Sequence, residues 1–269
     1  MERFPEAGYV YAVCGTRKYV DEVLTSVRSL KKHDPEAHVT LIVDADTSVA
    51  DDELSAFDHV VVVPGRFTEE DTWKDKLLFK VRHVYASSPY AKTFYLDSDT
   101  YLLGNCRGLF PLLDHFDLSL AHATNDRHKV TVSGVEIEAY TPYNTGVILF
   151  RKNEAVRDLF ARWLSCYEAR LTELPHDQPA FMEALALSPC TTYVFHNNWN
   201  ARLIFPEKYR GKVMILHTRD HDLDTVAARI NVRNRTRLWL SGIDQCLYKG
   251  MHGSDLLRIV LGYVKKRNS

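Results

Sequence analysis

The sequence predicts an α/β fold in a single domain, with a mostly parallel sheet flanked by helices. Short runs rich in β-branched residues alternate with amphipathic stretches over the first hundred residues, which is typical of a parallel, doubly wound sheet. No linker rich in Pro, Gly or Ser divides the chain, so one domain is expected. Ligands of such sheets bind at the carboxyl ends of the strands.

The first hundred residues contain four expected strands, at 9–14, 39–44, 59–63 and 92–97. Two helices are expected between them, because apolar residues recur at helical spacing from Tyr19 to Leu30 and from Trp73 to Tyr85. Each helix is followed by a proline, Pro35 or Pro89, which ends it.

The second half is less regular. Strands are expected at 117–123, 147–150 and 213–216, and helices at 153–170 and 177–187. Asp177 stands where an N-cap residue would begin the later helix. Residues 221–269 are expected to form a C-terminal helical extension.

Charge and composition exclude several classes of protein. Lys and Arg number 34 against 35 Asp and Glu, a net charge of −1, so binding of nucleic acid through bulk charge is not expected. No apolar run approaches the ~20 residues that span a bilayer, and the first residues do not resemble a secretory signal. The five cysteines include no Cys-x-x-Cys pair, which favours a reducing, cytoplasmic location.

Asp-x-Asp pairs are frequent enough by chance that context has to choose among them. The chain contains four such pairs: Asp44-Asp46, Asp97-Asp99, Asp220-Asp222 and Asp222-Asp224. The last two resemble the start of a calcium loop, but Thr225 and Asn231 occupy its Gly and Glu positions. We therefore interpret them as a solvated turn.

The pair Asp97 and Asp99 follows an expected strand, and a helix with Lys76 and Lys80 precedes that strand. Two carboxylates can bind a hard divalent cation and leave positions open for phosphate oxygens. A nearby lysine adds positive charge for a diphosphate. Asp44 ends another strand, where an acidic residue of a nucleotide-binding fold commonly meets a ribose or a base. A capped strand end beside a solvated lysine face remains the alternative.

The whole string from Phe94 to Phe110 resembles the DxD segment of GT-A-fold glycosyltransferases, most of all glycosyltransferase family 8. That family includes glycogenin and bacterial lipopolysaccharide hexosyltransferases. Further segments are similar to family motifs in the same order: the Asn-x-Gly strand at 143–150, the Asp-Gln pair at 176–178, the Asn-containing loop at 198–200 and the His-bearing strand at 213–217. The resemblance implies a GT-A catalytic domain over 1–220, with a nucleotide-binding half (1–104) and a donor-sugar and acceptor half (105–220).

The resemblance implies a metal site and a donor site. Asp97, Asp99 and His217 would bind Mn²⁺ or Mg²⁺, and the imidazole ligand favours Mn²⁺. The other implied contacts are to the donor: Lys80 or Lys76 to its charge, Thr16 and Tyr19 to the base, Asp44 to the base by a hydrogen bond, Ser98 to the ribose, and Asn144, Gly146, Asp177 and Gln178 around the donor sugar and the reaction centre.

Simpler explanations remain open at several of these positions. His217 also fits a core histidine, Asn144-Thr-Gly146 fits a turn into a strand, and Asp177 fits a plain helix cap. The sequence departs from the family after His217, where Thr218-Arg219 replaces the Gly and the later Lys-Pro-Trp segment that often follow. Arg219 could supply the missing diphosphate charge.

The resemblance implies a metal-dependent transferase that moves a hexosyl unit, glucose or galactose, from a UDP-sugar to a carbohydrate or glycolipid acceptor with retention of configuration. An inverting transferase, a sugar-1-phosphate nucleotidyltransferase and a non-catalytic sugar-nucleotide-binding module are the alternatives. Near the C-terminus, apolar residues from Leu256 to Val264 precede Lys265-Lys266-Arg267. Such a helix could touch an anionic membrane, although an ordinary packed helix is the favoured interpretation.

Overall fold

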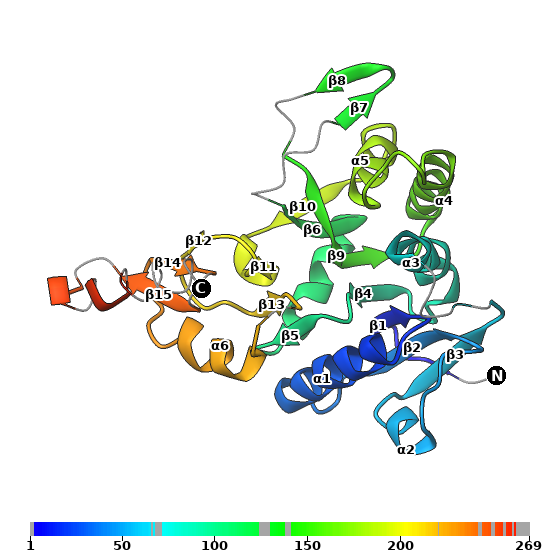
Figure 1. The fold of residues 1–269 in the computed structure, drawn as a ribbon. Coiled ribbons are helices and arrows are strands. Elements are labelled where there is room, and N and C mark those ends of the chain that lie inside the picture. Colours follow the sequence, from blue (N-terminus) through cyan, green and yellow to red (C-terminus); the bar gives the residue numbers. More distant parts are fainter. Residues whose placement is uncertain are drawn as a thin grey trace.

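The computed structural model describes residues 3–65, 67, 72–123, 130–137, 141–219, 221–241, 244–248, 251–254, 257–259 and 261. Its centre is a seven-stranded sheet (Figure 1). In spatial order the strands are β10 (Thr192–Phe195), β6 (Leu118–His122), β9 (Tyr143–Arg151), β4 (Lys92–Leu96), β1 (Ala7–Val13), β2 (Val39–Asp44) and β3 (His59–Val63).

The sheet is mostly parallel, as predicted. Strand β1 pairs in parallel with β2 and β4, and β10 pairs in parallel with β6. Strand β9 runs antiparallel to both of its neighbours, β4 and β6. Because β9 is reversed, its first residues reach the same edge of the sheet as the last residues of β4 and β6. That edge therefore receives side chains from both halves of the chain.

Helices cover both faces of the sheet (Figure 1). One face packs against α1 (Arg17–His33), α2 (Asp51–Leu54) and the 3₁₀-helix η1 (Arg107–Asp114). The other face packs against α3 (Trp73–Ser87), α4 (Glu154–Ala169) and α5 (Gln178–Ala186). The apolar residues that recur at helical spacing in the sequence are buried: Val20, Val23, Val27 and Leu30 of α1 are at most 1% exposed.

The remaining elements form smaller sheets. Strand β5 (Thr100–Leu102) pairs with β13 (Ile215–His217), which pairs with β11 (Ala201–Arg202) after the short 3₁₀-helix η2 (Asn197–Trp199). A separate hairpin consists of β7 (Val130–Val132) and β8 (Val135–Ile137).

Among the described residues after 220 there are strands as well as helix, where the sequence predicted a helical extension. They include α6 (Leu223–Ile230), the hairpin of β14 (Arg237–Leu240) and β15 (Gln245–Tyr248), and helical residues at 253–254, 257–259 and 261; β14 pairs with β12 (Glu207–Tyr209). Arg237 and Trp239 are buried while Leu238 is exposed. This period-two alternation produces a strand. Asp222, which we interpreted as part of a solvated turn, is the exposed N-cap of α6, and Asp220 lies outside the described residues.

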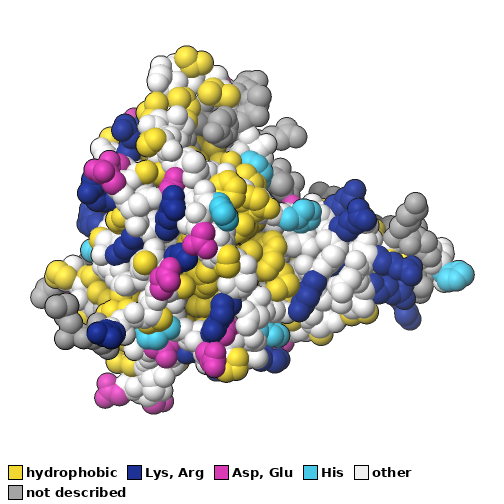
Figure 2. Space-filling model, turned by 180° about the vertical axis from the view of Figure 1, so that it is seen from behind, with side chains coloured by type: hydrophobic (Ala, Val, Ile, Leu, Met, Phe, Trp, Pro, Cys, Tyr) yellow, Lys and Arg dark blue, Asp and Glu magenta, His cyan; other side chains and the backbone are white. Residues whose placement is uncertain are grey.

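Most of the predicted C-terminal membrane helix lies outside the described residues, including Leu256, Val260 and everything from 262 to 269. The described Leu257 and Leu261 are exposed. Figure 2 shows Lys and Arg side chains gathered over the end of the molecule that carries β14 and β15. Within the described part of the chain, no helix has the length and apolar character needed to cross a membrane.

Candidate functional site

A cleft of about 240 Å³ opens where β1 and β4 end and β9 begins. It brings together most of the predicted site residues from distant parts of the sequence. The predicted residues that line it are Tyr19, Lys76, Lys80, Asp97, Ser98, Asp99, Asn144, Asp177, Gln178, His217 and Arg219.

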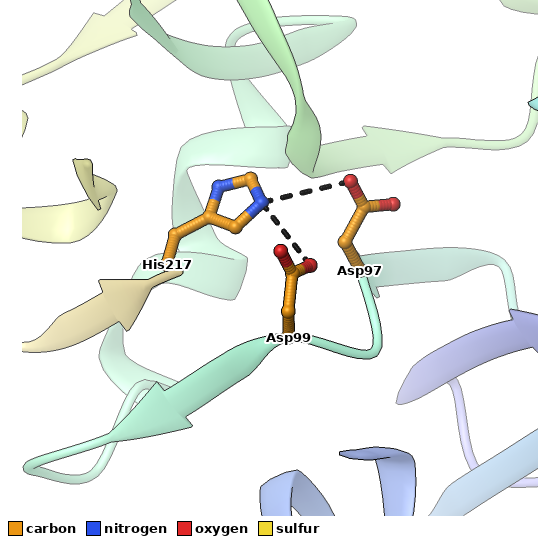
Figure 3. Close-up of side chains that lie close together, drawn as sticks. All are labelled: Asp97, Asp99 and His217. Atoms are coloured by element: carbon orange, nitrogen blue, oxygen red, sulfur yellow. Dashed lines mark ion pairs between the residues drawn. The ribbon is translucent and has the colours of Figure 1, made fainter. Parts of the chain in front are cut away.

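Asp97, Asp99 and His217 converge at one side of this cleft (Figure 3). The antiparallel pairing of β5 with β13 sets His217 opposite Thr100, the residue after Asp99. Nε2 of His217 lies 3.4 Å from Oδ1 of Asp99 and 3.7 Å from Oδ2 of Asp97. One ligand atom from each residue can be chosen so that all three lie within 4.8 Å of one another.

These three residues fit a divalent metal ion. Oδ1 of Asp99 is buried and accepts no hydrogen bond within the described residues, which would be costly unless a cation compensates it. The pKa of Asp99 lies well below its usual value. Burial opposes that shift, but the nearby His217 and Arg219 outweigh it. A set of two carboxylates and one imidazole suits a divalent ion such as Mn²⁺ or Mg²⁺.

Gly146 lies so close to Asp97 and His217 that a larger residue would collide with them. A Cβ atom at this position would lie 2.3 Å from Cε1 of His217 and 2.4 Å from Oδ2 of Asp97. The main-chain carbonyl of Gly146 also accepts a hydrogen bond of 2.7 Å from the main-chain N–H of Asp97. The glycine of the Asn-x-Gly segment thus allows β9 to pass directly against the side chains of Asp97 and His217.

Asp177 does not act as the helix cap that its position suggested. It precedes α5, but its side chain makes no capping hydrogen bond. Its carboxylate instead lies 2.8 Å from Nζ of Lys80 and accepts a hydrogen bond of 3.0 Å from Thr145. Burial lowers the pKa of Lys80, but Asp177 and Asp97 raise it to a net value above the ordinary one. Lys80 therefore stays charged inside the protein and neutralises two carboxylates.

Two further cationic side chains of the cleft, Arg219 and Lys76, lie close to the ring of Tyr19. The guanidinium of Arg219 lies 5.0 Å from the centre of the Tyr19 ring, and Nζ of Lys76 lies 5.5 Å from it. Arg219 also pairs with Glu22 at 3.1 Å and approaches Asp99 at 3.7 Å. Ser98 donates a hydrogen bond of 2.7 Å to the same Glu22. Glu22 thus connects the Asp97–Asp99 turn with the segment after His217.

Helix α3 brings both apolar and cationic side chains to the cleft. Trp73, Lys76, Leu77 and Lys80 all line it. Positions i, i+3, i+4 and i+7 share one face of a helix, which explains the arrangement. Trp73 is 47% exposed, so the cleft combines an accessible indole ring with two ammonium groups.

Thr16, Asp44 and Gly146 are predicted donor contacts that are not among the residues lining the cleft. The side chain of Thr16 caps α1 by accepting a hydrogen bond from the N–H of Lys18. Asp44 is buried after β2 and accepts hydrogen bonds from the main-chain N–H groups of Gly15 and Asp46. Both shape the loop after β1. Gln178 does line the cleft, and its buried Oε1 has no hydrogen-bond partner within the described residues.

The structure brings into the site several residues to which no sequence motif points. Glu22 lies in the middle of an amphipathic helix, where a glutamate is common. Tyr95 donates a hydrogen bond to Asp97, two residues further along, and its pKa is raised well above the usual value by burial and by Asp97. Asn200 belongs to the expected Asn-containing loop, and it accepts a hydrogen bond from His217. The contacts of Glu22 and Asn200 depend on the fold, so no local pattern marks them.

No family model matches the sequence, and no curated protein matches it. Solved structures of similar fold are glycosyltransferases of the GT-A fold. GlyE from Streptococcus pneumoniae TIGR4 superimposes with a TM-score of 0.51 at 18% identity, covering 73% of this chain and 47% of GlyE. An active-site mutant of LgtC gives a TM-score of 0.53 at 12% identity, covering 78% and 86%. Mouse xyloside xylosyltransferase 1 gives 0.53 at 15%, covering 80% and 98%.

The chain thus spans about half the length of GlyE and most of the other two chains. The sequence similarity is low throughout, so the likeness is one of fold. This chain has the GT-A fold.

Proposed function

We propose that this protein is a metal-dependent glycosyltransferase. It would transfer a hexosyl unit, glucose or galactose, from a UDP-sugar to a carbohydrate or glycolipid acceptor, as in glycosyltransferase family 8. The observation that carries the proposal is the convergence of Asp97, Asp99 and His217 in a cleft at the carboxyl end of β4, within a GT-A fold.

Mn²⁺, or Mg²⁺, bound by these three residues would stabilise the negative charge of the departing UDP. The side chains of the cleft have complementary tasks. Lys76 and Arg219 both lie close to the ring of Tyr19 and would bind the diphosphate, while the Tyr19 ring would offer a surface for the base. Lys80 is held by Asp177 and Asp97, so its charge positions these carboxylates.

Asn144, Asp177 and Gln178 also line the cleft and would orient the donor sugar. Oε1 of Gln178, which has no hydrogen-bond partner among the described residues, would accept a hydrogen bond from a sugar hydroxyl. Gly146 keeps this region open, and Ser98 lies between the metal ligands, where the ribose would pass. Thr16 and Asp44 would act on the base indirectly, through the loop after β1.

The carboxylates of the cleft support a retaining reaction. An inverting enzyme needs a carboxylate base that is free to take a proton from the acceptor. Among the described residues that line the cleft, the carboxylates are Asp97, Asp99 and Asp177. Two of them belong to the metal set and Asp177 is paired with Lys80, so none is left for that role.

The experiment is an assay of UDP release from a panel of UDP-sugars, with Mn²⁺, Mg²⁺ or EDTA and without an acceptor. We expect slow hydrolysis of one donor, abolished by EDTA. Release of pyrophosphate when a nucleoside triphosphate reacts with a sugar phosphate would instead indicate a nucleotidyltransferase. Calorimetric binding of UDP and Mn²⁺ without any turnover would indicate a non-catalytic binding module, and neither binding nor turnover would contradict the proposal.

We also propose a cytoplasmic location with peripheral contact to an anionic membrane. The five cysteines are free thiols, as suits a reducing compartment. Exposed apolar side chains, Val232 and Leu257, accompany the exposed Arg233 and Arg235 near the C-terminus. Sedimentation with anionic and neutral vesicles tests this contact, which would be refuted if both vesicle types leave the protein in the supernatant.

A further inference from the structure

We propose that Asn200 is a positioning residue that orients the metal ligand His217 and the cleft residue Asn144 together. The inference rests on the proposed metal site and concerns how this chain prepares it. Asn200 lies between the two residues and forms a hydrogen bond with each, at 2.8 Å to Nδ1 of His217 and 2.9 Å to Oδ1 of Asn144.

Asn144, Asn200 and His217 form a hydrogen-bond network, and the direction of each of its hydrogen bonds follows from one main-chain group. The N–H of Gly146 can only donate, and it lies 3.0 Å from the side chain of Asn144, so that atom must be the acceptor Oδ1. Asn200 faces the same Oδ1 and must therefore present its NH₂ group there. The other end of the Asn200 amide, Oδ1, then faces His217.

Because Oδ1 of Asn200 can only accept, Nδ1 of His217 must carry the proton. In the neutral imidazole this leaves the lone pair on Nε2, the atom that faces Asp97 and Asp99. A metal ligand needs that lone pair. The chain of hydrogen bonds that starts at Gly146 therefore selects the tautomer of His217 that can bind the metal.

This hydrogen-bond network is rigid because it is buried and its residues come from three separate elements. Asn144, Asn200 and His217 are 2%, 1% and 6% exposed. They come from β9, from the residue before β11 and from β13, and β11 pairs with β13 through Arg202 and His217. Turning any one of the amides would place two donors or two acceptors against each other without water, which is costly.

The same hydrogen-bond network restricts which group of Asn144 is left to bind a substrate. Its Oδ1 already accepts hydrogen bonds from Gly146 and Asn200, while the side chain lines the cleft. The group left for a ligand is its NH₂, a donor that suits a sugar hydroxyl or carbonyl oxygen. Asn200 thus connects the orientation of a metal ligand with that of a substrate contact.

Two substitutions separate these effects. Asn200→Ala removes both hydrogen bonds, and we expect Mn²⁺ to bind 10- to 100-fold more weakly, as is typical for loss of a partner behind a metal ligand. Asn200→Asp keeps an acceptor for His217 but loses the donor for Asn144. We expect it to bind Mn²⁺ at least as tightly as the wild type, and to release UDP at least about tenfold more slowly because Asn144 is misoriented.

Asn198→Ala is the matched control. Asn198 lies two residues away and is also buried, but its NH₂ group donates only to the main-chain carbonyls of Arg210 and Lys212, each at 2.8 Å. Its loss disturbs the same segment without touching His217. We expect the Mn²⁺ affinity of this variant to stay within about threefold of that of the wild type.

The measurement is a titration of the full chain with Mn²⁺ alone, followed by electron paramagnetic resonance, with circular dichroism to check folding. Weak Mn²⁺ binding by Asn200→Ala with normal binding by Asn200→Asp would support the role of Asn200. Equal affinity of Asn200→Ala and the wild type, or equal losses in Asn200→Ala and Asn198→Ala, would overturn it. If the wild type binds no Mn²⁺, the metal site fails and this inference fails with it. Normal Mn²⁺ binding without UDP release would contradict only the proposed function.

Discussion

Lys80 and Asp177 form a buried ion pair in which Nζ lies 2.8 Å from the carboxylate, and the two side chains are 5% and 3% exposed. Thr145 donates a further hydrogen bond to Asp177, and the indole N–H of Trp163 donates to its main-chain carbonyl. A pair of this kind attaches α3 to the start of α5 and to β9. It also places a permanent positive charge 3.9 Å from Asp97.

Lys80→Met is expected to lower the free energy of unfolding by about 3–5 kcal/mol, because Asp177 is left as a buried charge without a partner. The double variant Lys80→Met/Asp177→Asn should recover part of that loss. Urea denaturation measures both. Arg82→Met on the same helix is the control, since its pair with Glu168 is exposed and should contribute less than about 1 kcal/mol. Equal destabilisation by Lys80→Met and Arg82→Met would contradict the prediction.

Asp99→Asn should reduce metal-dependent UDP release by at least about 100-fold, because the metal would lose an anionic ligand that stabilises the departing charge. Asp222→Asn provides a matched change in another Asp-x-Asp pair. Asp222 caps α6 away from the cleft, and asparagine caps helices equally well. A rate for Asp99→Asn close to that of Asp222→Asn would show that Asp99 is not a metal ligand.

Gly146→Ala should abolish Mn²⁺ binding and cost about 1–3 kcal/mol of stability, because the added methyl group would collide with His217 and Asp97. The colliding atoms belong to the side chains of His217 and Asp97, so relieving the contact would move these two groups out of their arrangement. Gly108→Ala is the control, since nothing lies within 4 Å of a Cβ atom there. Calorimetric titration with Mn²⁺ and thermal unfolding test both variants, and normal binding by Gly146→Ala would be the adverse result.

Acid should destabilise the sheet through Asp117. Burial alone would raise the pKa of this carboxyl group, but hydrogen bonds from Thr191, Arg151 and Asn153 hold the pKa at about 2 instead of 3.8. A carboxyl with a depressed pKa stabilises the folded state above pH ~4, and that contribution, on the order of 2 kcal/mol, disappears as the pH falls to about 2. Urea denaturation between pH 2 and 5 should show this slope in the wild type and a flatter one in Asp117→Asn. Identical slopes would exclude Asp117 as the cause.

The local sequence was sufficient for most of the central sheet. Strands β2 and β3 begin and end where predicted, because their continuous β-branched runs are buried or paired along their full length. Helices α1, α3 and α4 also lie where the apolar spacing placed them. The short strands β14 and β15 were missed, since four-residue segments carry too little periodicity to distinguish a strand from an extension of a helix.

The direction of β9 could not be read from its residues. A reversed strand in a parallel sheet has the same buried, apolar composition as its neighbours. Its orientation nevertheless decides that Asn144 and Gly146 lie beside Asp97. The role of Asp177 could not be read from its position either. The residue does stand at the start of a helix, but its carboxylate pairs with Lys80, which only the fold brings close.

The sequence by itself determined the α/β class, the position of the acidic pair after β4 and, through ordered motifs, the residues that gather around it. The tertiary structure alone decided that Glu22 pairs with Arg219 and that Asn200 orients His217. Periodicity and capping are short-range properties of the chain, whereas these contacts join residues far apart in sequence. They exist only when the β5–β13 pairing and the reversed β9 have brought three elements to one edge of the sheet.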